Sequence, residues 1–280
     1  MSNFNNKIDF ALVISVKNAN PNGDPLNGNR PRATYSNIGE ISDVCIKRKI
    51  RNRLMQEGES IFVQSDESKT DDYKSLSERF KAEIKSIKGE KEVFDFVCKK
   101  WLDVRAFGQV FAFKSDTKGV SIGVRGPISI HPAFSVDTIN TTSTQITKSV
   151  NSETKEGKSS DTMGMKHRVD FGVYIVFGSI NVQLAKVTGF SNEDALAIKQ
   201  VLRTLFRNDA SSARPEGSME VSKLIWWHHN SAIGQYSTAK VHRTLSVQKK
   251  DGVNEPDSMN DYAINIEELK DLNFEIIDGE

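Results

Sequence analysis

The sequence predicts an α+β fold in which two helices pack on one sheet and two long insertions extend from it. Apolar runs rich in β-branched residues are interleaved with two segments of helical spacing, in the order strand, helix, strands, helix, strand. Polar stretches at residues 59–100 and 136–168 interrupt this order. The order matches a ferredoxin-like or RNA-recognition-type sheet, a fold that hosts many functions.

The first strand is predicted at Ile8–Lys17, and a loop rich in Asn, Gly and Pro follows it. Backbone N–H groups of such a loop could face a phosphate, and two arginines add positive charge to it. A connection that only caps the sheet explains the pattern equally well. The candidate binding residues of this loop are Asn20, Asn22, Gly23, Arg30 and Arg32.

A helix is predicted from Ser42, the expected N-cap, to about Glu57. At 100° per residue, Ile46, Ile50 and Leu54 fall on one stripe that faces the sheet. Five cations lie within seven positions of this helix, with no acid among them. Lys47 and Arg51 border the stripe on one side, and Lys49 and Arg53 border it on the other. Arg48 points away from the core.

These cations repel one another by roughly 0.2–0.5 kcal/mol per close pair. A solvated helix face usually mixes acids with bases, as residues 66–100 do with nine of each. The unmixed charge therefore favours contact with a polyanion. Lys47, Arg48 and Arg51 are the candidates for phosphate contact.

The first insertion has helical spacing at Lys74–Lys88 and Lys91–Leu102, which predicts solvated helices. Strands are expected to return at Gly108–Phe113 and Gly119–Ile130. The second insertion alternates over Thr138–Val150 and becomes loop-like over Asn151–Asp161. This pattern predicts a long protruding hairpin.

The remainder predicts strands at Val169–Phe177 and Ile180–Val187, a helix capped by Ser191, and a strand at Met219–His228. An acidic helix and a strand are expected over Ala263–Ile277. Residues 251–280 hold ten acids and one lysine, a net charge of −9. Because the whole chain has a net charge of +1, the preceding 250 residues carry a net charge of +10. Such a polarised chain can attract a polyanion at its basic part.

Composition excludes several classes of protein. Cys45 and Cys98 have no partner spacing, so a disulfide or metal framework is not expected, and a reducing cytoplasm fits. No apolar run is long enough to cross a bilayer. His228 and His229 are adjacent on a predicted strand and would point to opposite faces, so they do not form one ligand set. No metal and no cofactor is expected.

Several motifs carry a family resemblance. They include Asn18-x-Asn-Pro-Asn-Gly-Asp-Pro, Ile41-Ser-Asp-Val-Cys-Ile-Lys-Arg-Lys-Ile-Arg-Asn, Asp103-Val-Arg-Ala-Phe-Gly, Met163-Gly-Met-Lys-His-Arg and Asn208-Asp-Ala-Ser-Ser-Ala-Arg-Pro-Glu-Gly-Ser-Met. The chain resembles the family that forms the repeated guide-RNA-binding backbone of type I CRISPR Cascade complexes, and is most similar to its subtype I-C members.

The resemblance implies a hand-like organisation. The palm would comprise residues 1–58, 101–135 and 169–250, with helical fingers at 59–100, a hairpin thumb at 136–168 and an acidic segment at 251–280. It adds Arg105, Lys148, His167 and Arg168 to the candidate RNA-binding residues. It also implies a non-catalytic scaffold whose copies stack head to tail on the guide RNA, beside other Cascade subunits, and present the guide to target DNA.

Two alternatives stay open. Related type III backbone subunits cut RNA with an acidic residue in the loop after the first strand, and Asp24 occupies a comparable place. A turn-forming role of this aspartate, between Gly23 and Pro25, is the simpler interpretation. A stand-alone single-stranded RNA-binding module would instead stack bases on strand aromatics such as Phe171 and Phe177.

Overall fold

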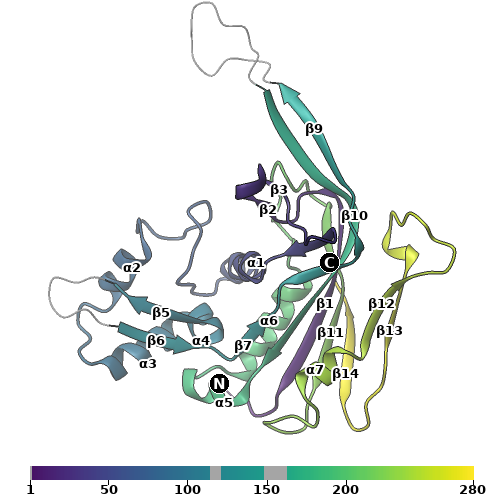
Figure 1. Ribbon diagram of the computed structural model, residues 1–280. Helices are drawn as coiled ribbons and strands as arrows, with labels where there is room; N and C mark the ends of the chain where they lie inside the picture. Colours follow the sequence, from purple (N-terminus) through teal and green to yellow (C-terminus); the bar gives the residue numbers. More distant parts are fainter. Residues whose placement is uncertain (1, 114–120, 148–162) are drawn as a thin grey trace, which may run out of the picture.

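A computed structural model describes residues 2–113, 121–147 and 163–280 of the chain. Its centre is an antiparallel sheet with the strand order β14-β11-β1-β10-β8-β4, in which β7 and β9 also pair with β10 (Figure 1). The strands of this sheet are β1 (Ile8–Ala19), β4 (Ile38–Ile41), β7 (Ile128–Ile130), β8 (Ala133–Thr138), β9 (Thr141–Thr147), β10 (Met163–Ile180), β11 (Met219–His228) and β14 (Asn273–Asp278). Strand β1 is the middle strand and is almost entirely buried, as its unbroken apolar run predicts.

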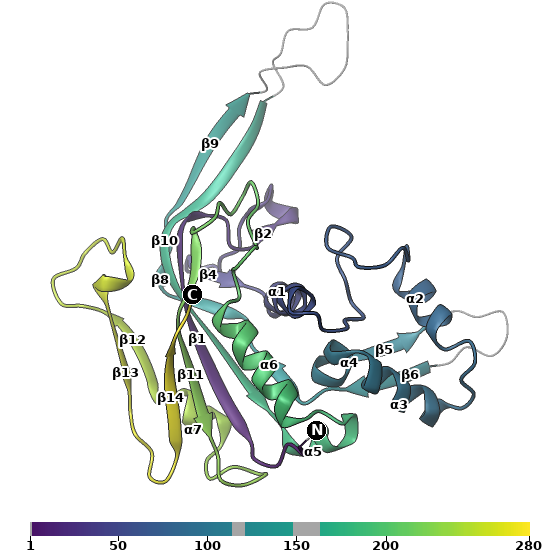
Figure 2. The ribbon, with the colours of Figure 1, turned by 180° about the vertical axis from the view of Figure 1, so that it is seen from behind.

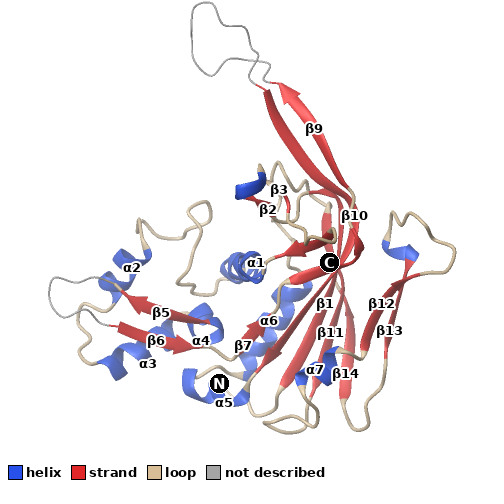
Figure 3. Cartoon of the chain, viewed as in Figure 1, coloured by secondary structure: helices blue, strands red, loops and turns tan. Residues whose placement is uncertain are grey.

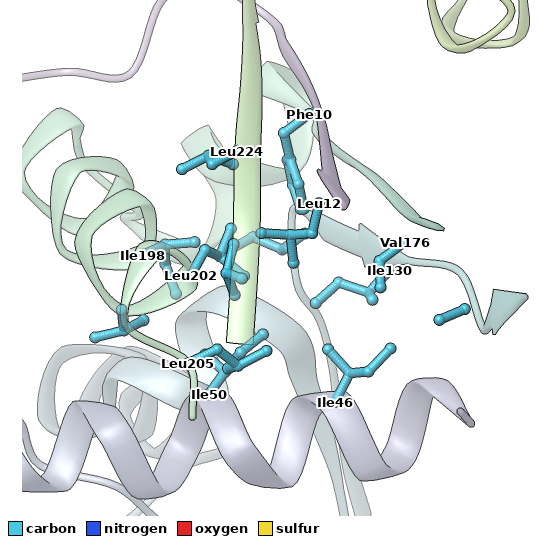
Figure 4. Close-up of a cluster of buried hydrophobic side chains, with 14 of the residues drawn as sticks. Phe10, Leu12, Ile46, Ile50, Ile130, Val176, Ile198, Leu202, Leu205 and Leu224 are labelled. Carbon is cyan, nitrogen blue, oxygen red and sulfur yellow. The ribbon is translucent and has the colours of Figure 1, made fainter. Parts of the chain in front are cut away.

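Two helices cover one face of the sheet: α1 (Asp43–Gln56) and α6 (Asn192–Arg203). Figure 2 shows α6 beside β1, with α1 next to α6. Ile50 of α1 lies beside Leu205 and Ile46 lies near Ile130, in the same buried cluster as Leu12 of β1 and Ile198 and Leu202 of α6 (Figure 4). The predicted apolar stripe of α1 is confirmed, since Ile46, Ile50 and Leu54 are all buried.

The opposite face is covered by α7 (Thr238–His242) and by a hairpin of β12 (Leu245–Lys249) and β13 (Tyr262–Ile266). Short 3-10 turns lie at Pro25–Asn27 and Met259–Asp261. Phe171 and Phe177 pack beneath this cover with Trp227. The expected acidic helix in Ala263–Ile277 is wrong: this stretch forms most of β13 and β14, joined by a turn, because its apolar residues alternate against the cover and β11.

A second, separate core lies beside the sheet. It is built from α2 (Leu76–Glu83), α3 (Glu90–Lys100), α4 (Leu102–Phe107) and a two-stranded sheet of β5 (Gly108–Ala112) and β6 (Ser121–Arg125), as Figure 3 shows. We expected β5 and β6 to continue the main sheet. They pair with each other instead, because Phe111, Ile122 and Val124 pack on Phe80 and Trp101 of the helical part.

The predicted hairpin is confirmed over its described residues. Strand β9 pairs with the first seven residues of β10, from Met163↔Thr147 to Val169↔Thr141, and the pair projects from the sheet (Figure 1). The expected tip, Asn151–Asp161, lies outside the described residues. Strand β10 continues into the main sheet without a break, so the hairpin is an extension of the sheet itself.

The chain after β10 differs from the expected strand at Ile180–Val187. It forms helix α5 (Val182–Thr188), because the Asn181 side chain accepts a hydrogen bond from the Leu184 N–H and caps the first turn. Ser191 caps α6 as predicted, in a capping box with Asp194. Within the described ranges, no helix has the length and apolar character that a membrane span needs.

A buried ion pair joins the two cores. The Arg105 guanidinium of α4 donates to both carboxylate oxygens of Asp194 in α6, at 2.9 and 2.7 Å, and both residues are buried. Such a bidentate pair fixes the distance and the orientation of its partners. The guanidinium that the resemblance assigns to RNA is thus already occupied in holding α4 against α6.

Replacing Arg105 by Met should lower the free energy of unfolding by about 3–5 kcal/mol, because Asp194 would keep a buried charge without its partner. Urea denaturation of the full chain measures this. Arg168→Met is the matched control, since Arg168 and its partner Asp170 are each nearly half exposed; it should cost about 0–1 kcal/mol. Equal losses for the two variants would contradict a structural role for Arg105.

Candidate nucleic-acid interface

The start of helix α1 is fixed by the loop that follows β1. The Ser42 hydroxyl accepts from the Cys45 N–H at 3.3 Å, which confirms Ser42 as the N-cap. The Asn22 side-chain oxygen accepts from the Ser42 N–H at 3.0 Å and from the Ser42 hydroxyl at 2.9 Å. The loop and the positive end of the α1 dipole are therefore held together.

Between this loop and α1 lies a cleft of about 530 Å³. Its described lining contains three arginines, two asparagines and no aspartate or glutamate. The lining residues are Pro21, Asn22, Gly23, Asn29, Ser42, Val44, Cys45, Arg48, Arg51, Val63, Gln64, Ser65 and Arg214. A concave site with donors of one charge sign suits a polyanion.

The two predicted arginines in the cleft differ in their surroundings. Arg48 is exposed and makes no ion pair or hydrogen bond with another side chain in the described part of the chain. Arg51 is largely buried, and its Nε donates to Asp103 at 3.0 Å. The Asp103 carboxylate also accepts from the Phe62 and Val63 N–H groups, at 2.7 and 3.0 Å. Arg48 therefore supplies the freer charge.

The other cations of α1 are engaged within the protein. Lys47 pairs with Asp43 one turn away, at 2.9 Å, and does not line the cleft. Lys49 is buried, and its ammonium contacts the Asp209 carboxylate. Arg53 is also buried, and it donates to the Thr204 carbonyl oxygen at 3.1 Å. Lys49 and Arg53 thus form a buried border of the helix, whereas Arg48 and Arg51 line the cleft.

The loop after β1 folds into a small hairpin of β2 (Gly23–Asp24) and β3 (Arg30–Pro31). Asp24 accepts from the Leu26 N–H at 3.2 Å, so the turn-forming interpretation of this aspartate is confirmed. A Cβ at Gly23 would lie 2.0 Å from the Asn29 Oδ1 atom, so a larger residue there would require the Asn29 side chain to move. Asn20 is buried and donates to the Asn29 carbonyl oxygen at 2.7 Å.

A second hollow, of about 440 Å³, lies between this small hairpin and the base of β9. Its lining includes Arg30 and Arg32 but also Asp24 and Glu40, so its charge is mixed. The Arg32 Nε atom is buried without a partner among the described residues, and its Nη2 atom lies 3.5 Å from Asp24.

Arg30 also reaches the projecting hairpin. Its Nη2 donates to the Ser143 hydroxyl at 3.2 Å, and that hydroxyl lies 2.8 Å from the His167 Nδ1 atom. Arg168 alternates to the other face of β10 and pairs with Asp170 at 3.4 Å. Lys148 lies outside the described residues. The structure therefore brings two of the predicted hairpin and loop residues together at the hairpin base.

Arg214 is a cation of the cleft that the sequence pattern does not predict. It follows a run of small residues in the motif Asn208-Asp-Ala-Ser-Ser-Ala-Arg-Pro, where its position carries no helical or strand periodicity. A lone arginine flanked by Ala and Pro in a loop was the available signal. Arg105 lies outside this cleft, in its pair with Asp194.

The titratable groups near the sheet have structural partners. The His229 Nε2 atom lies 2.8 Å from the Asp9 carboxylate, and His228 lies 2.6 Å from Glu275. Burial raises the pKa of the Cys98 thiol to about 12, so this thiol stays protonated at neutral pH. Among the described residues, no three His, Cys, Asp or Glu side chains gather in a way that could hold a metal ion.

These features define a class: an α/β protein with a large antiparallel sheet, two projecting parts and a basic cleft at the loop that caps a helix. The particular family follows from the sequence. The model of the family CRISPR-associated protein Cas7 matches residues 6–267, and the chain belongs to that family.

Individual relatives are distant. The CRISPR-associated protein Cas7 of Haloferax volcanii is 23% identical over 225 residues, which cover 74% of this chain and 66% of that protein. The chain thus spans slightly less than two thirds of the length of this curated relative.

Among solved structures, a chain of a CRISPR RNA-guided surveillance complex in its pre-nicking state is similar with a TM-score of 0.51 and 14% identity, covering 79% of this chain and 78% of that one. A chain of another CRISPR RNA-guided surveillance complex has a TM-score of 0.47 and 16% identity, covering 89% and 78%. The similarity to the pre-nicking complex chain indicates a shared fold.

Replacing Asn22 by Ala should lower the free energy of unfolding by about 1–2 kcal/mol, because two hydrogen bonds to the start of α1 disappear. Asn22→Asp keeps the acceptor and places a negative charge near the positive helix end, so it should retain most of the stability. Urea denaturation of both variants measures the difference. Equal destabilisation by Ala and Asp would contradict the capping role of Asn22.

Proposed function

We propose that the protein is a non-catalytic scaffold that holds the guide RNA of a type I CRISPR surveillance complex, with subtype I-C as the nearest kind. Membership of the Cas7 family supports the assignment. The observation that carries the site is the cleft beside α1, which three arginines line without an acid among its described residues. The proposed place of action is the cytoplasm.

The arrangement fits binding of the backbone rather than reading of bases. Arginines and backbone N–H groups contact phosphates, and such contacts position a strand without selecting its sequence. A guide must keep its base edges free for pairing with target DNA. We therefore assign Arg48 and Arg51 to guide phosphates, with Asn22 and Gly23 shaping the loop between them.

We further propose that the sheet is a ferredoxin-like palm. The neighbouring strands β11, β1, β10 and β7, with α1 and α6 on one face, have the spatial order of that fold. The part around α2–α4 would be the fingers and the β9–β10 hairpin the thumb. Copies would stack head to tail along the guide, because a heterologous contact that does not close generates a filament.

The thumb residues enter this proposal at the hairpin base. Arg30, Ser143 and His167 form a chain of polar contacts there, and Arg168 lies on the opposite strand face. A guide strand that leaves the cleft would meet these groups next. Arg32, in the neighbouring hollow, adds a buried Nε donor without a partner in the described chain. Lys148 stays a candidate from the resemblance alone.

A stand-alone RNA-binding module is less well supported. Such a module stacks bases on aromatics of its open sheet face. Here one face lies under α1 and α6, and the other, with Phe171 and Phe177, lies under α7 and the β12–β13 hairpin.

An Asp24 nuclease is less well supported for a different reason. Its carboxylate is engaged by the Leu26 N–H and by Arg32 at 3.5 Å. A metal-dependent cut would also require further ligands around the ion.

Arg48→Ala should weaken binding of the full chain to single-stranded guide RNA and reduce the slope of log affinity against log salt by about 0.7, because one phosphate contact is lost. Fluorescence anisotropy over a salt series measures both quantities. Lys250→Ala is the matched control, since Lys250 is exposed just after β12, on the cover of the opposite face. An unchanged slope for Arg48→Ala would remove this cleft from the proposal.

Copy number separates the scaffold from its alternatives. Guides of increasing length should bind increasing numbers of the chain in regular steps, which native mass spectrometry measures. Each guide should also stay intact in the presence of Mg²⁺ or Mn²⁺. A single copy per RNA at every length would favour the stand-alone module, and cleavage abolished by Asp24→Asn would favour the nuclease.

A further inference from the structure

We propose that Arg214 is a further phosphate-binding residue of the cleft, and that Asp209 and Lys49 are positioning residues that hold it there. The inference rests on the proposed binding of guide RNA and adds a contact from a segment other than α1. It also gives a specific role to a cation of α1 that is too deeply buried to reach a ligand.

The backbone that carries Arg214 is held in place before any ligand binds. Ser211 and Arg214 exchange two backbone hydrogen bonds, at 2.8 and 3.0 Å, which closes a tight turn. The Ala213 carbonyl oxygen accepts from the Asn20 N–H at 2.9 Å and ties this turn to the loop after β1. The turn and the loop that form two walls of the cleft are therefore one unit.

One carboxylate serves two cations at this turn. The same Asp209 oxygen contacts the Lys49 ammonium and accepts from the Arg214 Nε at 3.3 Å. The Lys49 side chain is 1% exposed and its ammonium also lies over the Phe206 ring, 5.4 Å from the ring centre. Burial lowers the pKa of Lys49, and the charge of Asp209 opposes this change.

Two cations and one carboxylate leave an excess of one positive charge, and geometry places it at Arg214. Lys49 is enclosed by the core, whereas Arg214 lines the cleft. The Arg214 side chain is only 17% exposed, so it lies largely within the protein surface. The Arg214 Nε atom donates the hydrogen bond to Asp209, and the two terminal nitrogens, Nη1 and Nη2, make no hydrogen bond with the described residues.

A partly desolvated guanidinium with two unused terminal nitrogens matches a phosphate, which accepts two parallel hydrogen bonds. A nucleic-acid backbone is the source that the cleft favours. Arg48 lines the same cleft, so a strand bound there would meet arginines from two segments, α1 and the 211–214 turn. Arg214 would then add a second contact to the one that Arg48 makes.

Arg214→Ala should lower the affinity of the full chain for single-stranded guide RNA about tenfold and reduce its salt slope by about 0.7, as for Arg48→Ala. Arg214→Lys should keep the salt slope, because the charge remains, but recover only part of the affinity, because the planar fork is lost. A salt slope for Arg214→Ala equal to that of the unaltered chain, while Arg48→Ala lowers it, overturns this inference and leaves the proposed function standing. Absence of salt-dependent RNA binding by the unaltered chain overturns both.

The positioning role is tested through coupling. Asp209→Asn should weaken RNA binding in the unaltered chain and have almost no effect in the Arg214→Ala background, because it acts through Arg214. Asp209→Glu, which keeps the carboxylate, should recover part of the binding. Urea denaturation of each variant shows how much of the folded chain remains under the binding conditions. Equal losses from Asp209→Asn in both backgrounds overturn the positioning role.

Discussion

The pairing of buried cations on α1 with carboxylates from distant segments is the constraint on which the rest of this structure depends. A helix with five cations in seven positions must lie against an apolar sheet, and a buried charge without a partner is strongly destabilising. Lys49 is therefore matched by Asp209 after α6, and Arg51 by Asp103 of α4. Each pair ties α1 to another part of the chain, so the helix becomes the junction of the main sheet, the second core around α4 and the 208–217 loop. The same pairs decide which charges remain for a ligand.

The local features of this junction could be predicted from the sequence. Ser42 caps α1, and Ile46, Ile50 and Leu54 form its buried stripe, because capping and amphipathic spacing are properties of a few neighbouring residues. The turn at Asp24 and the long hairpin follow from local composition in the same way. Within the helix, the 100° spacing of residues correctly predicts that Arg48 points away from the core, and it places Lys49 and Arg53 together on the border that is buried.

The features that were missed depend on contacts between distant residues. Nothing near Lys49 indicates that its carboxylate lies 160 residues later in the sequence. Arg105 looked like a free cation of a motif, yet Asp194 occupies it. The alternation of β5 and β6 predicted strands correctly but did not say which core they would join. Residues near the chain end were expected to form an acidic helix, although they complete the sheet on β11 and the cover of its far face. Arg214 enters the cleft only because the loop around it folds back on Asn20.

Strand β10 belongs to two parts of the molecule at once. Its first residues form the projecting hairpin, and the rest lie in the main sheet between β1 and β8 (Figure 1). At about 3.3 Å per residue, its 18 residues span roughly 60 Å without a joint. Side chains alternate along that whole length, so the number of residues between His167 and the main sheet decides whether His167 lies on the face where Ser143 and Arg30 meet it. Inserting or deleting two residues on each strand of the hairpin keeps that face, whereas a change of one residue on each strand turns His167 to the other face.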